Sequence, residues 1–291
     1  MNNNQDITLH AQIVIVESGA TKSDWRVLDG DGKQVKQFLR SGMNVSTMQL
    51  SGIKDIISEA VGSEGLHGIL GFYMYTAGVV TDAIRGELTD AVRDLCPDAR
   101  IDIQNDLMGA ARSACGHSPG IAAILGTGSN TCFYDGITLS QKVYSGGYVI
   151  GDDGSGASLG RLFLSDFIKG IVPEAVAADF SREFDSSYAA IVEGVYRSPS
   201  PSGYLGSLAP FIIARYGDPY IKELVDNNFR RFIDRSLLRY DVKDYPVGIV
   251  GGFGWACRDI LRPLLDRAGI RVSRFIKAPI DGLCEYHKPI C

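Results

Sequence analysis

The sequence predicts an α/β protein made of two lobes, each with a mixed sheet that starts as a β-meander. Residues 14–28 read as strand, small-residue turn and strand, and an Asp-Gly turn then leads to a third strand ending at Leu39. The same order recurs over residues 121–144, which is evidence of an internal duplication. The length of 291 residues is also long for one hydrophobic core and natural for two.

The first lobe is placed at residues 1–115, with strands and helices alternating after the meander. Ser46 or Thr47 is expected to cap its first helix, and Asn105 and Asp106 its last. The pattern predicts strands at 67–73 and 100–104, and helices at 46–60, 81–96 and 107–114.

The second lobe is placed at residues 116–278 and carries a helical insertion over about 170–241. A closing helix within about 279–291 can pack back on the first lobe. After the repeated meander, the pattern predicts helices at 155–169, 173–183, 185–196, 203–216, 219–240 and 255–268, and strands at 246–250 and 271–276.

Composition excludes several classes of protein. The formal charge of −5 argues against a sequence-independent nucleic-acid binder, because such binding needs clustered basic residues. No apolar run reaches the roughly 18 residues that span a bilayer, so no membrane partner is expected. The polar start of the chain lacks the features of a signal peptide, so a cytoplasmic location is expected.

The six cysteines are scattered without C-x-x-C spacing, at Cys96, Cys115, Cys132, Cys257, Cys284 and Cys291. This spacing suggests neither a zinc site nor a disulfide framework. We expect most of them to be small buried hydrophobic residues in a reducing compartment.

Three turns have the composition of phosphate or nucleotide loops. The turn at 17–23 and the turn at 126–130 are both small and rich in hydroxyl groups, and a glycine turn at 251–254 lies between a strand and a helix. Exposed N–H groups in such turns favour anions, and two hairpins can grip a triphosphate from both sides. The alternative for the first turn, taken alone, is an ordinary tight hairpin.

Two carboxylates have positions suited to chemistry. Glu17 ends the first strand, where it can hold a hydrated Mg²⁺. Asp106 opens a helix, where the helix N-terminus stabilises its anion by typically about 0.3–1 kcal/mol, and phosphoryl transfer needs a group that orients a hydroxyl and accepts its proton. The alternative for Asp106 in isolation is a plain helix cap.

In their order, these motifs resemble the actin-like ATPase and sugar kinase superfamily. The nearest resemblance is to the N-acetylglucosamine kinases, together with the activator ATPases of benzoyl-CoA reductase and 2-hydroxyglutaryl-CoA dehydratase. The motifs run from residue 14 to the end of the chain: 17–25, Asp106, 125–130, 151–155 and 250–253. The resemblance implies two actin-like, ribonuclease H-like lobes with the nucleotide in the cleft between them.

The resemblance also implies roles for individual residues. Asp106 would be the catalytic base, and Mg²⁺ would be held by Glu17 through water. The sugar-binding residues would be Asn44, Asp106, Thr127, Gly147, Tyr148 and Asp152. The ATP-binding residues would be Ser18, Gly19, Ala20, Thr21, Lys22, Ser23, Gly126, Thr127, Gly128, Ser129, Gly251, Gly252 and Phe253.

The chain departs from the family pattern at a few positions. Glu17 stands where the family usually has Asp, and Ser18 and Ala20 stand where it usually has Gly. Gly146 occupies a position where many N-acetylglucosamine kinases have Trp, so the sugar and the hydroxyl that it presents stay open.

The expected activity is ATP-dependent phosphoryl transfer to a hydroxyl of an amino sugar of the N-acetylglucosamine or glucosamine type. One alternative is an activator-type ATPase of a partner redox enzyme, in which Cys115 and Cys132 would be the cysteines to consider for an iron–sulfur cluster. Another is a nucleotide- or sugar-binding regulator without turnover. A homodimer is an open alternative to a monomer.

Overall fold

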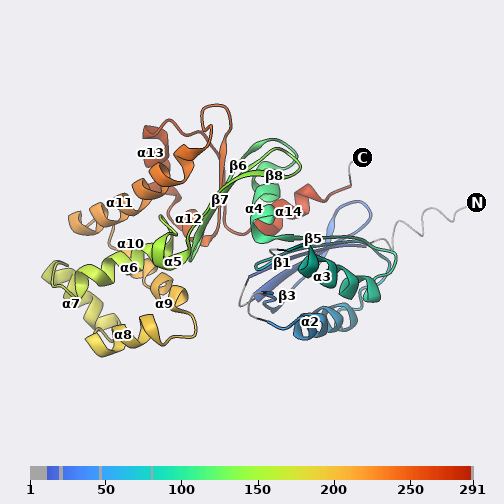
Figure 1. The fold of residues 1–291 in the computed structure, drawn as a ribbon, viewed down its shortest axis with the longest axis horizontal. Helices are drawn as coiled ribbons and strands as arrows, with labels where there is room; N and C mark the ends of the chain where they lie inside the picture. The colour runs from blue at the N-terminus through green and yellow to red at the C-terminus, as the bar shows by residue number, and fades with distance from the viewer. Residues whose placement is uncertain (1–11, 20–21, 46–47, 80, 290–291) are drawn as a thin grey trace, which may run out of the picture. The chain divides into compact units, whose positions relative to one another are not determined.

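The computed structural model describes residues 12–19, 22–45, 48–79 and 81–289 (Figure 1). By its internal contacts the chain divides into two compact units. Unit 1 comprises Met1–His117 and Pro279–Cys291, and unit 2 comprises Ser118–Ala278.

The sheet of unit 1 has the strand order β3-β2-β1-β4-β5 in the described part of the chain. Strands β1, β2 and β3 form an antiparallel meander, and β4 and β5 continue the sheet parallel to β1. The strands are β1 (Gln12–Ser18), β2 (Lys22–Leu28), β3 (Gln34–Ser41), β4 (Ile69–Thr76) and β5 (Arg100–Asn105).

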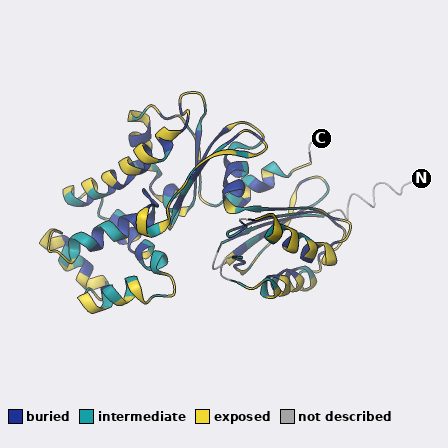
Figure 2. Ribbon diagram, in the orientation of Figure 1, coloured by how far each residue is buried: buried dark blue, intermediate teal, exposed yellow. Residues whose placement is uncertain are grey.

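Four described helices accompany this sheet. Helix α4 is buried along most of its length and packs against α14, which returns to unit 1 from the far end of the sequence (Figure 2). Trp25 lies fully buried in the core, stacked on Phe38 and edge-on to Phe72. The helices are α2 (Leu50–Ser63), α3 (Asp82–Leu95), α4 (Asp106–Cys115) and α14 (Pro279–Tyr286).

The sheet of unit 2 repeats the topology of the first. Its order is β10-β9-β6-β7-β8, with an antiparallel meander of β6, β7 and β8 and with β9 and β10 parallel to β6. The strands are β6 (Gly120–Leu125), β7 (Ser129–Tyr134), β8 (Leu139–Val143), β9 (Val247–Val250) and β10 (Val272–Ile276).

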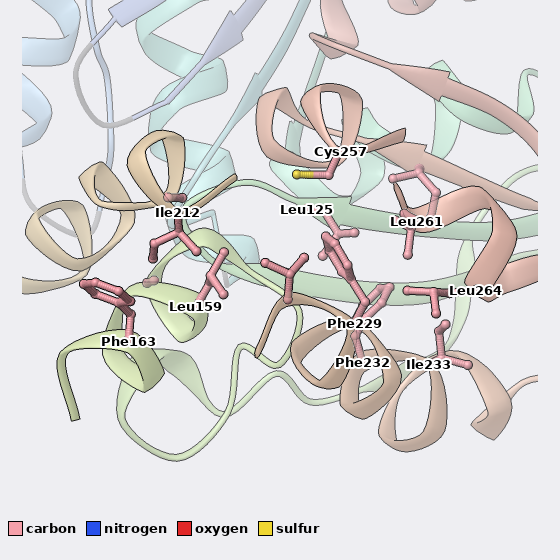
Figure 3. Close-up of a cluster of buried hydrophobic side chains, with 14 of the residues drawn as sticks. Leu125, Leu159, Phe163, Ile212, Phe229, Phe232, Ile233, Cys257, Leu261 and Leu264 are labelled. Carbon is pink, nitrogen blue, oxygen red and sulfur yellow. The ribbon is translucent and has the colours of Figure 1, made fainter. Parts of the chain in front are cut away.

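Most helices of unit 2 come from the connection between β8 and β9. Leu125 at the end of β6, together with Leu159, Phe229 and Leu261 from the helices, belongs to one hydrophobic core (Figure 3). The helices are α5 (Gly147–Ile150), α6 (Gly156–Phe167), α7 (Glu174–Glu183), α8 (Tyr188–Tyr196), α9 (Pro201–Ser207), α10 (Ala209–Ile213), α11 (Pro219–Arg235), the 3-10 helix η1 (Leu237–Arg239), α12 (Gly252–Ala256) and α13 (Arg258–Arg267).

The predicted fold class, α/β with two mixed sheets that each start as a β-meander, is confirmed. Several element boundaries were wrong. The helix expected at 203–216 is split at Leu208, because Pro210 has no N–H to donate to the preceding turn. The helix expected at 255–268 begins earlier and is divided at Cys257, and the helix expected at 219–240 ends at Arg235.

Two smaller differences concern the site. Strand β4 extends to Thr76, beyond the expected end at Tyr73, because its last residues pair with β1 and β5. The caps expected at Ser46 and Thr47 lie outside the described residues, and α2 begins at Leu50.

Candidate active site

The first group of candidate residues lies at the carboxyl ends of the three parallel strands of unit 1. Ser18 of β1 is in register with Thr76 of β4, and Thr76 is in register with Asn105 of β5. Asp106 follows Asn105 directly, and Glu17 precedes Ser18. Parallel pairing therefore brings the two carboxylates predicted from the sequence to the same edge of one sheet, the edge where open α/β sheets bind ligands.

The loop that carries Asn44 is fixed to this edge by two buried hydroxyl groups. The Ser18 Oγ accepts a hydrogen bond from the Met43 N–H at 2.7 Å, and the Thr76 Oγ1 donates to the Met43 carbonyl. The Val45 N–H donates to the Ala77 carbonyl at 3.3 Å. The Ser18 hydroxyl is thus engaged by the predicted sugar-binding loop, a contact that the sequence did not reveal.

Glu17 lies in an environment that disfavours its charge. Burial is the largest effect, and the negative charges of Asp24 and Asp106 add to it, so that the pKa of Glu17 rises to about 7. Asp24 is its partner in the β1–β2 register and forms an ion pair with Arg26 at 2.7 Å. Asp24 was not among the site residues predicted from the sequence, although its place opposite Glu17 in the hairpin could have indicated it.

Asp106 occupies the first position of α4. Asn105 caps this helix, its Oδ1 accepting from the Met108 N–H at 2.8 Å, while an Asp106 carboxylate oxygen accepts from the Leu107 N–H at 2.9 Å. The Asp106 side chain is exposed. The cap and the catalytic candidate are therefore two neighbouring residues, and the candidate lies at the surface of the unit.

Helix α4 is locked to the sheet by a partly buried polar network. The Arg112 guanidinium pairs with Asp102 at 2.6 Å and donates to the Tyr75 hydroxyl at 2.7 Å. The same hydroxyl lies 2.7 Å from the His287 Nε2 of the C-terminal segment. Gly109 lets the helix approach closely, since a Cβ there would lie 3.0 Å from the Tyr75 Cβ. This network holds α4 against the sheet, and Asp106 is the first residue of that helix.

The predicted first phosphate turn is described only in part, because Ala20 and Thr21 lie outside the described residues. Gly19 N–H donates to the Lys22 carbonyl at 3.1 Å and so closes the turn. Lys22 is exposed, whereas the Ser23 hydroxyl is buried between the Trp25 indole N–H and the Ser41 carbonyl, each 2.9 Å away. Among the described side chains of this turn, the exposed ammonium group of Lys22 can meet an anion.

The second phosphate turn, in unit 2, is shaped by the N-terminus of α6. The N–H groups of Gly156 and Ala157 donate to the carbonyls of Gly126 and Thr127, each at 3.0 Å. The carbonyls thus point toward the helix, and within the described chain the N–H groups of Thr127 and Gly128 have no acceptor. Outward N–H groups in a tight turn favour anions, so this geometry is compatible with the predicted phosphate turn.

Asp152 is held in a strained backbone conformation beside this turn. Its φ of 50° is the one positive value outside glycine among the described residues, and its side chain is 8% exposed. One carboxylate oxygen accepts from the Ser129 N–H at 3.3 Å, and the other packs so closely on Gly128 that a Cβ there would lie 2.9 Å away. Burial is the main cause that raises the pKa of Asp152.

Residues from α11 hold the Asp152 loop, and no motif in the sequence indicated them. The Asn228 amide accepts from the Gly154 N–H and donates to the Ser155 carbonyl, both at 3.2 Å. Asp153 is paired with Arg231 at 2.9 Å and Arg235 at 3.0 Å. A loop with this many fixed atoms can position Asp152 without help from a ligand.

The third glycine turn borders an apolar groove of about 630 Å³ within unit 2. Gly251 has a φ of 124° and packs on the backbone of Leu125, where a Cβ would lie 2.4 Å from the carbonyl oxygen. The groove is lined by Gly126, Thr127, Gly156, Gly206, Ala209, Pro210, Ile213, Ala214, Gly252, Phe253, Ala256 and Cys257. Small apolar walls of this kind suit a flat aromatic ring, and residues 206–214 of the helical insertion form part of these walls beside Gly252 and Phe253.

Gly147 and Tyr148 lie in α5, a one-turn helix that the sequence did not predict. The Gly151 N–H donates to the Gly147 carbonyl at 2.8 Å, and the Asp152 N–H to the Ser145 carbonyl at 2.9 Å. These bonds fold α5 onto the loop of Asp152, so the predicted sugar-binding residues 147, 148 and 152 belong to one folded segment.

The donors for a metal ion are sparse. Among the described residues, no three His, Cys, Asp or Glu side chains meet closely enough to hold a metal by themselves. Glu17 still fits a hydrated cation, because a positive charge would offset the burial and the neighbouring carboxylates that raise its pKa.

No helix in the described ranges is both long and apolar enough to cross a membrane.

Most of the described cysteines are buried, as the sequence predicted. Cys96, Cys132, Cys257 and Cys284 are buried, and Cys115 is half-buried. Burial raises the pKa of Cys257 to about 12 and that of Cys284 to about 11, as expected of thiols in an apolar core.

Two mixed sheets of the same topology, each starting as a meander, define the actin-like ATPase fold. No protein-family model and no curated protein matches the chain. Among solved structures, the chain is 37% identical to a candidate N-acetylglucosamine kinase from Porphyromonas gingivalis, with a TM-score of 0.88 over 95% of this chain and 98% of that one. At this identity and coverage, the chain belongs to the N-acetylglucosamine kinase-like group of the actin-like ATPase and sugar kinase superfamily.

Two more distant structures support the fold. A candidate N-acetylglucosamine kinase from Chromobacterium violaceum is 19% identical, with a TM-score of 0.74 over 94% of this chain and 98% of that one. A ROK family glucokinase from Streptomyces griseus, solved with glucose and AMPPNP, is 21% identical, with a TM-score of 0.57 over the same shares.

Proposed function

We propose that this protein is an ATP-dependent kinase that transfers the γ-phosphoryl group of ATP to a hydroxyl of an amino sugar of the N-acetylglucosamine or glucosamine type. The observation that carries the proposal is the likeness to the Porphyromonas gingivalis protein over nearly the whole of both chains. The exposed carboxylate of Asp106, at the start of a helix locked to the sheet, supports it.

ATP is proposed to use the three turns singled out in the sequence. The outward N–H groups of Thr127 and Gly128 suit phosphate oxygens, and Lys22 adds a positive charge from the other turn. The groove bordered by Gly252 and Phe253 suits the adenine ring. The remaining predicted contacts of Ser18, Gly19, Ala20, Thr21, Ser23, Gly126, Ser129 and Gly251 are part of the same proposal.

The sugar is proposed to be bound by Asn44 from unit 1 and by Thr127, Gly147, Tyr148 and Asp152 from unit 2. Asn44 and Asp152 are held by the fixed loops described above, so little order is lost when they bind a ligand.

Asp106 is proposed to act as the base. Its carboxylate accepts the proton of the sugar hydroxyl, the hydroxyl oxygen bonds to the γ-phosphorus, and the bond from that phosphorus to the bridging oxygen breaks to release ADP. A carboxylate stabilised by a helix N-terminus is a weak base, which suffices because the proton leaves late in phosphoryl transfer.

Mg²⁺ would be held by Glu17, in the proposal through water. When bound, it supplies positive charge against the phosphate oxygens. The role of the chain here is to keep a carboxylate poised beside the turn, with Asp24 and its partner Arg26 fixing the neighbouring strand.

The test is a coupled assay of ADP release with a panel of hexosamines and Mg²⁺-ATP. We expect turnover that depends on an amino sugar and that Asp106→Asn lowers by at least about 100-fold, with ATP binding nearly intact. Equal turnover without any sugar, in a brown iron-bearing preparation, would favour an activator-type ATPase. ATP binding without turnover on any sugar would favour a regulator.

A further inference from the structure

A second groove of about 380 Å³ lies in unit 2, among α5, α6 and α8. Its walls are apolar or aromatic and include Tyr148, Tyr188 and Tyr196. Tyr188 and Tyr196 are 71% and 80% exposed. Large exposed aromatic side chains that gather at a groove of this size are typical of small-molecule sites, whose volumes run from roughly 300 to 1,000 Å³.

Arg161 of α6 is the one charged residue that lines this groove in the described part of the chain. The structure gives its guanidinium no hydrogen bond and no ion pair, and its Nε is shielded from solvent without an acceptor. Arg215 of the same unit, by contrast, pairs with Asp179 and Glu183. Arg161 is half-buried, and a guanidinium without a carboxylate partner beside apolar and aromatic walls makes the groove complementary to a negative charge.

The groove begins at a residue of the proposed sugar site. Tyr148 lines it, and α5, which carries Tyr148, is folded onto the loop of Asp152. A sugar held by these residues would therefore direct a substituent along the tyrosines toward Arg161.

We propose that this groove binds a substituent of the acceptor sugar, and that the substituent is an apolar or aromatic arm ending in a carboxylate that pairs with Arg161. This rests on the proposed function, whose substrate class it narrows. The planar guanidinium fork matches a carboxylate with two parallel hydrogen bonds, and the tyrosine faces cover the arm.

Calorimetric titration without nucleotide tests the proposal. The probes are glucosamine acylated on nitrogen with a 4-carboxybenzoyl group and its neutral counterpart with a 4-carbamoylbenzoyl group. We expect the carboxylate to bind about tenfold more tightly, as a charge-assisted hydrogen bond to the Arg161 guanidinium allows. Arg161→Met, which keeps the apolar stem, is expected to remove this preference, and Arg161→Lys to restore part of it.

Arg197→Met is the matched control, because Arg197 is an exposed arginine that ends α8 and does not line the groove. It should keep the full preference for the carboxylate. Equal binding of the two probes to the native protein, or a preference that survives in Arg161→Met, would overturn the proposal.

Turnover of N-acetylglucosamine, measured separately, distinguishes this proposal from the proposed function. If N-acetylglucosamine is phosphorylated while the carboxylate probe gains nothing, the groove proposal fails and the kinase stands. If the preference depends on Arg161 but no sugar is turned over, the groove proposal stands as a binding site and the kinase fails.

Discussion

In both units an antiparallel meander is followed by two parallel strands, but the two hairpins carry different chemistry at their tips. In unit 1 the β1–β2 hairpin has Glu17 opposite Asp24, and burial disfavours the charged form of Glu17. In unit 2 the corresponding hairpin has a neutral turn whose carbonyls are held by α6. The connection after the third strand also differs, since it holds one described helix in unit 1 and most of the helices in unit 2.

The comparison shows how one sheet topology can be specialised in two ways. Unit 1 gathers carboxylates at the edge of its sheet and fixes them with short connections. Unit 2 uses its long helical connection to build walls, which form the apolar groove beside Phe253 and the groove at Arg161. We infer that unit 1 supplies charge for the reaction and unit 2 supplies shape for the ligands.

The largest expected effect is that of removing the proposed base. Asp106→Asn should lower kcat by at least about 100-fold with little change in KM for ATP, because general bases contribute roughly 10²–10⁴. Asp152→Asn, an equally conservative change in unit 2, should mainly raise KM for the sugar. Steady-state kinetics of both variants would contradict the division of roles if Asp152→Asn lowered kcat as much as Asp106→Asn.

The next effect separates two adjacent glycines of unit 2. Gly251→Ala should destabilise the protein by roughly 2–4 kcal/mol, because its φ is 124° and the new Cβ would lie 2.4 Å from the Leu125 carbonyl oxygen. Gly252→Ala has open space around the new Cβ and should leave stability unchanged, yet raise KM for ATP. Denaturant unfolding and ATP kinetics of both variants check this prediction. Equal destabilisation by the two substitutions would contradict the difference in packing between Gly251 and Gly252.

An effect of similar size on stability concerns the support of α4. Arg112→Met should cost about 2–4 kcal/mol of unfolding free energy, because it leaves Asp102 and Tyr75 without their shared partner in a poorly hydrated site. It should also lower kcat, since Asp106 is carried by the same helix. Arg85→Met, which breaks an exposed pair with Asp82, is the control and should change stability by less than about 0.5 kcal/mol. Similar losses in the two variants would argue against a special role for the Arg112 network.

The smallest effect is a change in the pH dependence of stability. Glu17 has a pKa of 4.5 when unperturbed and about 7 in the native protein, so between these values the native state holds a proton that the unfolded chain has lost. The contribution of Glu17 to the free energy of unfolding is therefore fully present below pH 4.5. It is lost as the pH rises through 7, a loss of up to about 3 kcal/mol. Glu17→Gln should be more stable than the native chain at pH 8 and similar to it at pH 4.5, while turning over more slowly.

Thermal unfolding across this range checks the prediction, with the exposed Glu87→Gln as a control that should leave the pH dependence unaltered. A stability difference between Glu17→Gln and the native chain that stays constant with pH would contradict the assigned environment of Glu17.

Much of this arrangement could be predicted because it is encoded locally. Alternating β-branched residues predicted the two meanders, and the pair Asn105-Asp106 predicted both the helix start and the candidate base. Asn228, Arg112 and His287 could not be predicted, because their roles arise from contacts between segments distant in the chain. The groove walls at Pro210 and Ile213 were missed for the same reason, since nothing in a helix sequence tells which turn its apolar face will cover.

The hydrogen bond from the Met43 N–H to the Ser18 hydroxyl has a consequence for how the two substrates influence each other. Because the residue that ends the first strand of the phosphate hairpin also holds the loop of Asn44, a ligand that steadies one of these segments steadies the other. Such linkage is reciprocal, so sugar and ATP should each bind more tightly in the presence of the other, by the same factor. Ser18→Ala should remove this coupling, so that the affinity for each substrate no longer depends on the presence of the other.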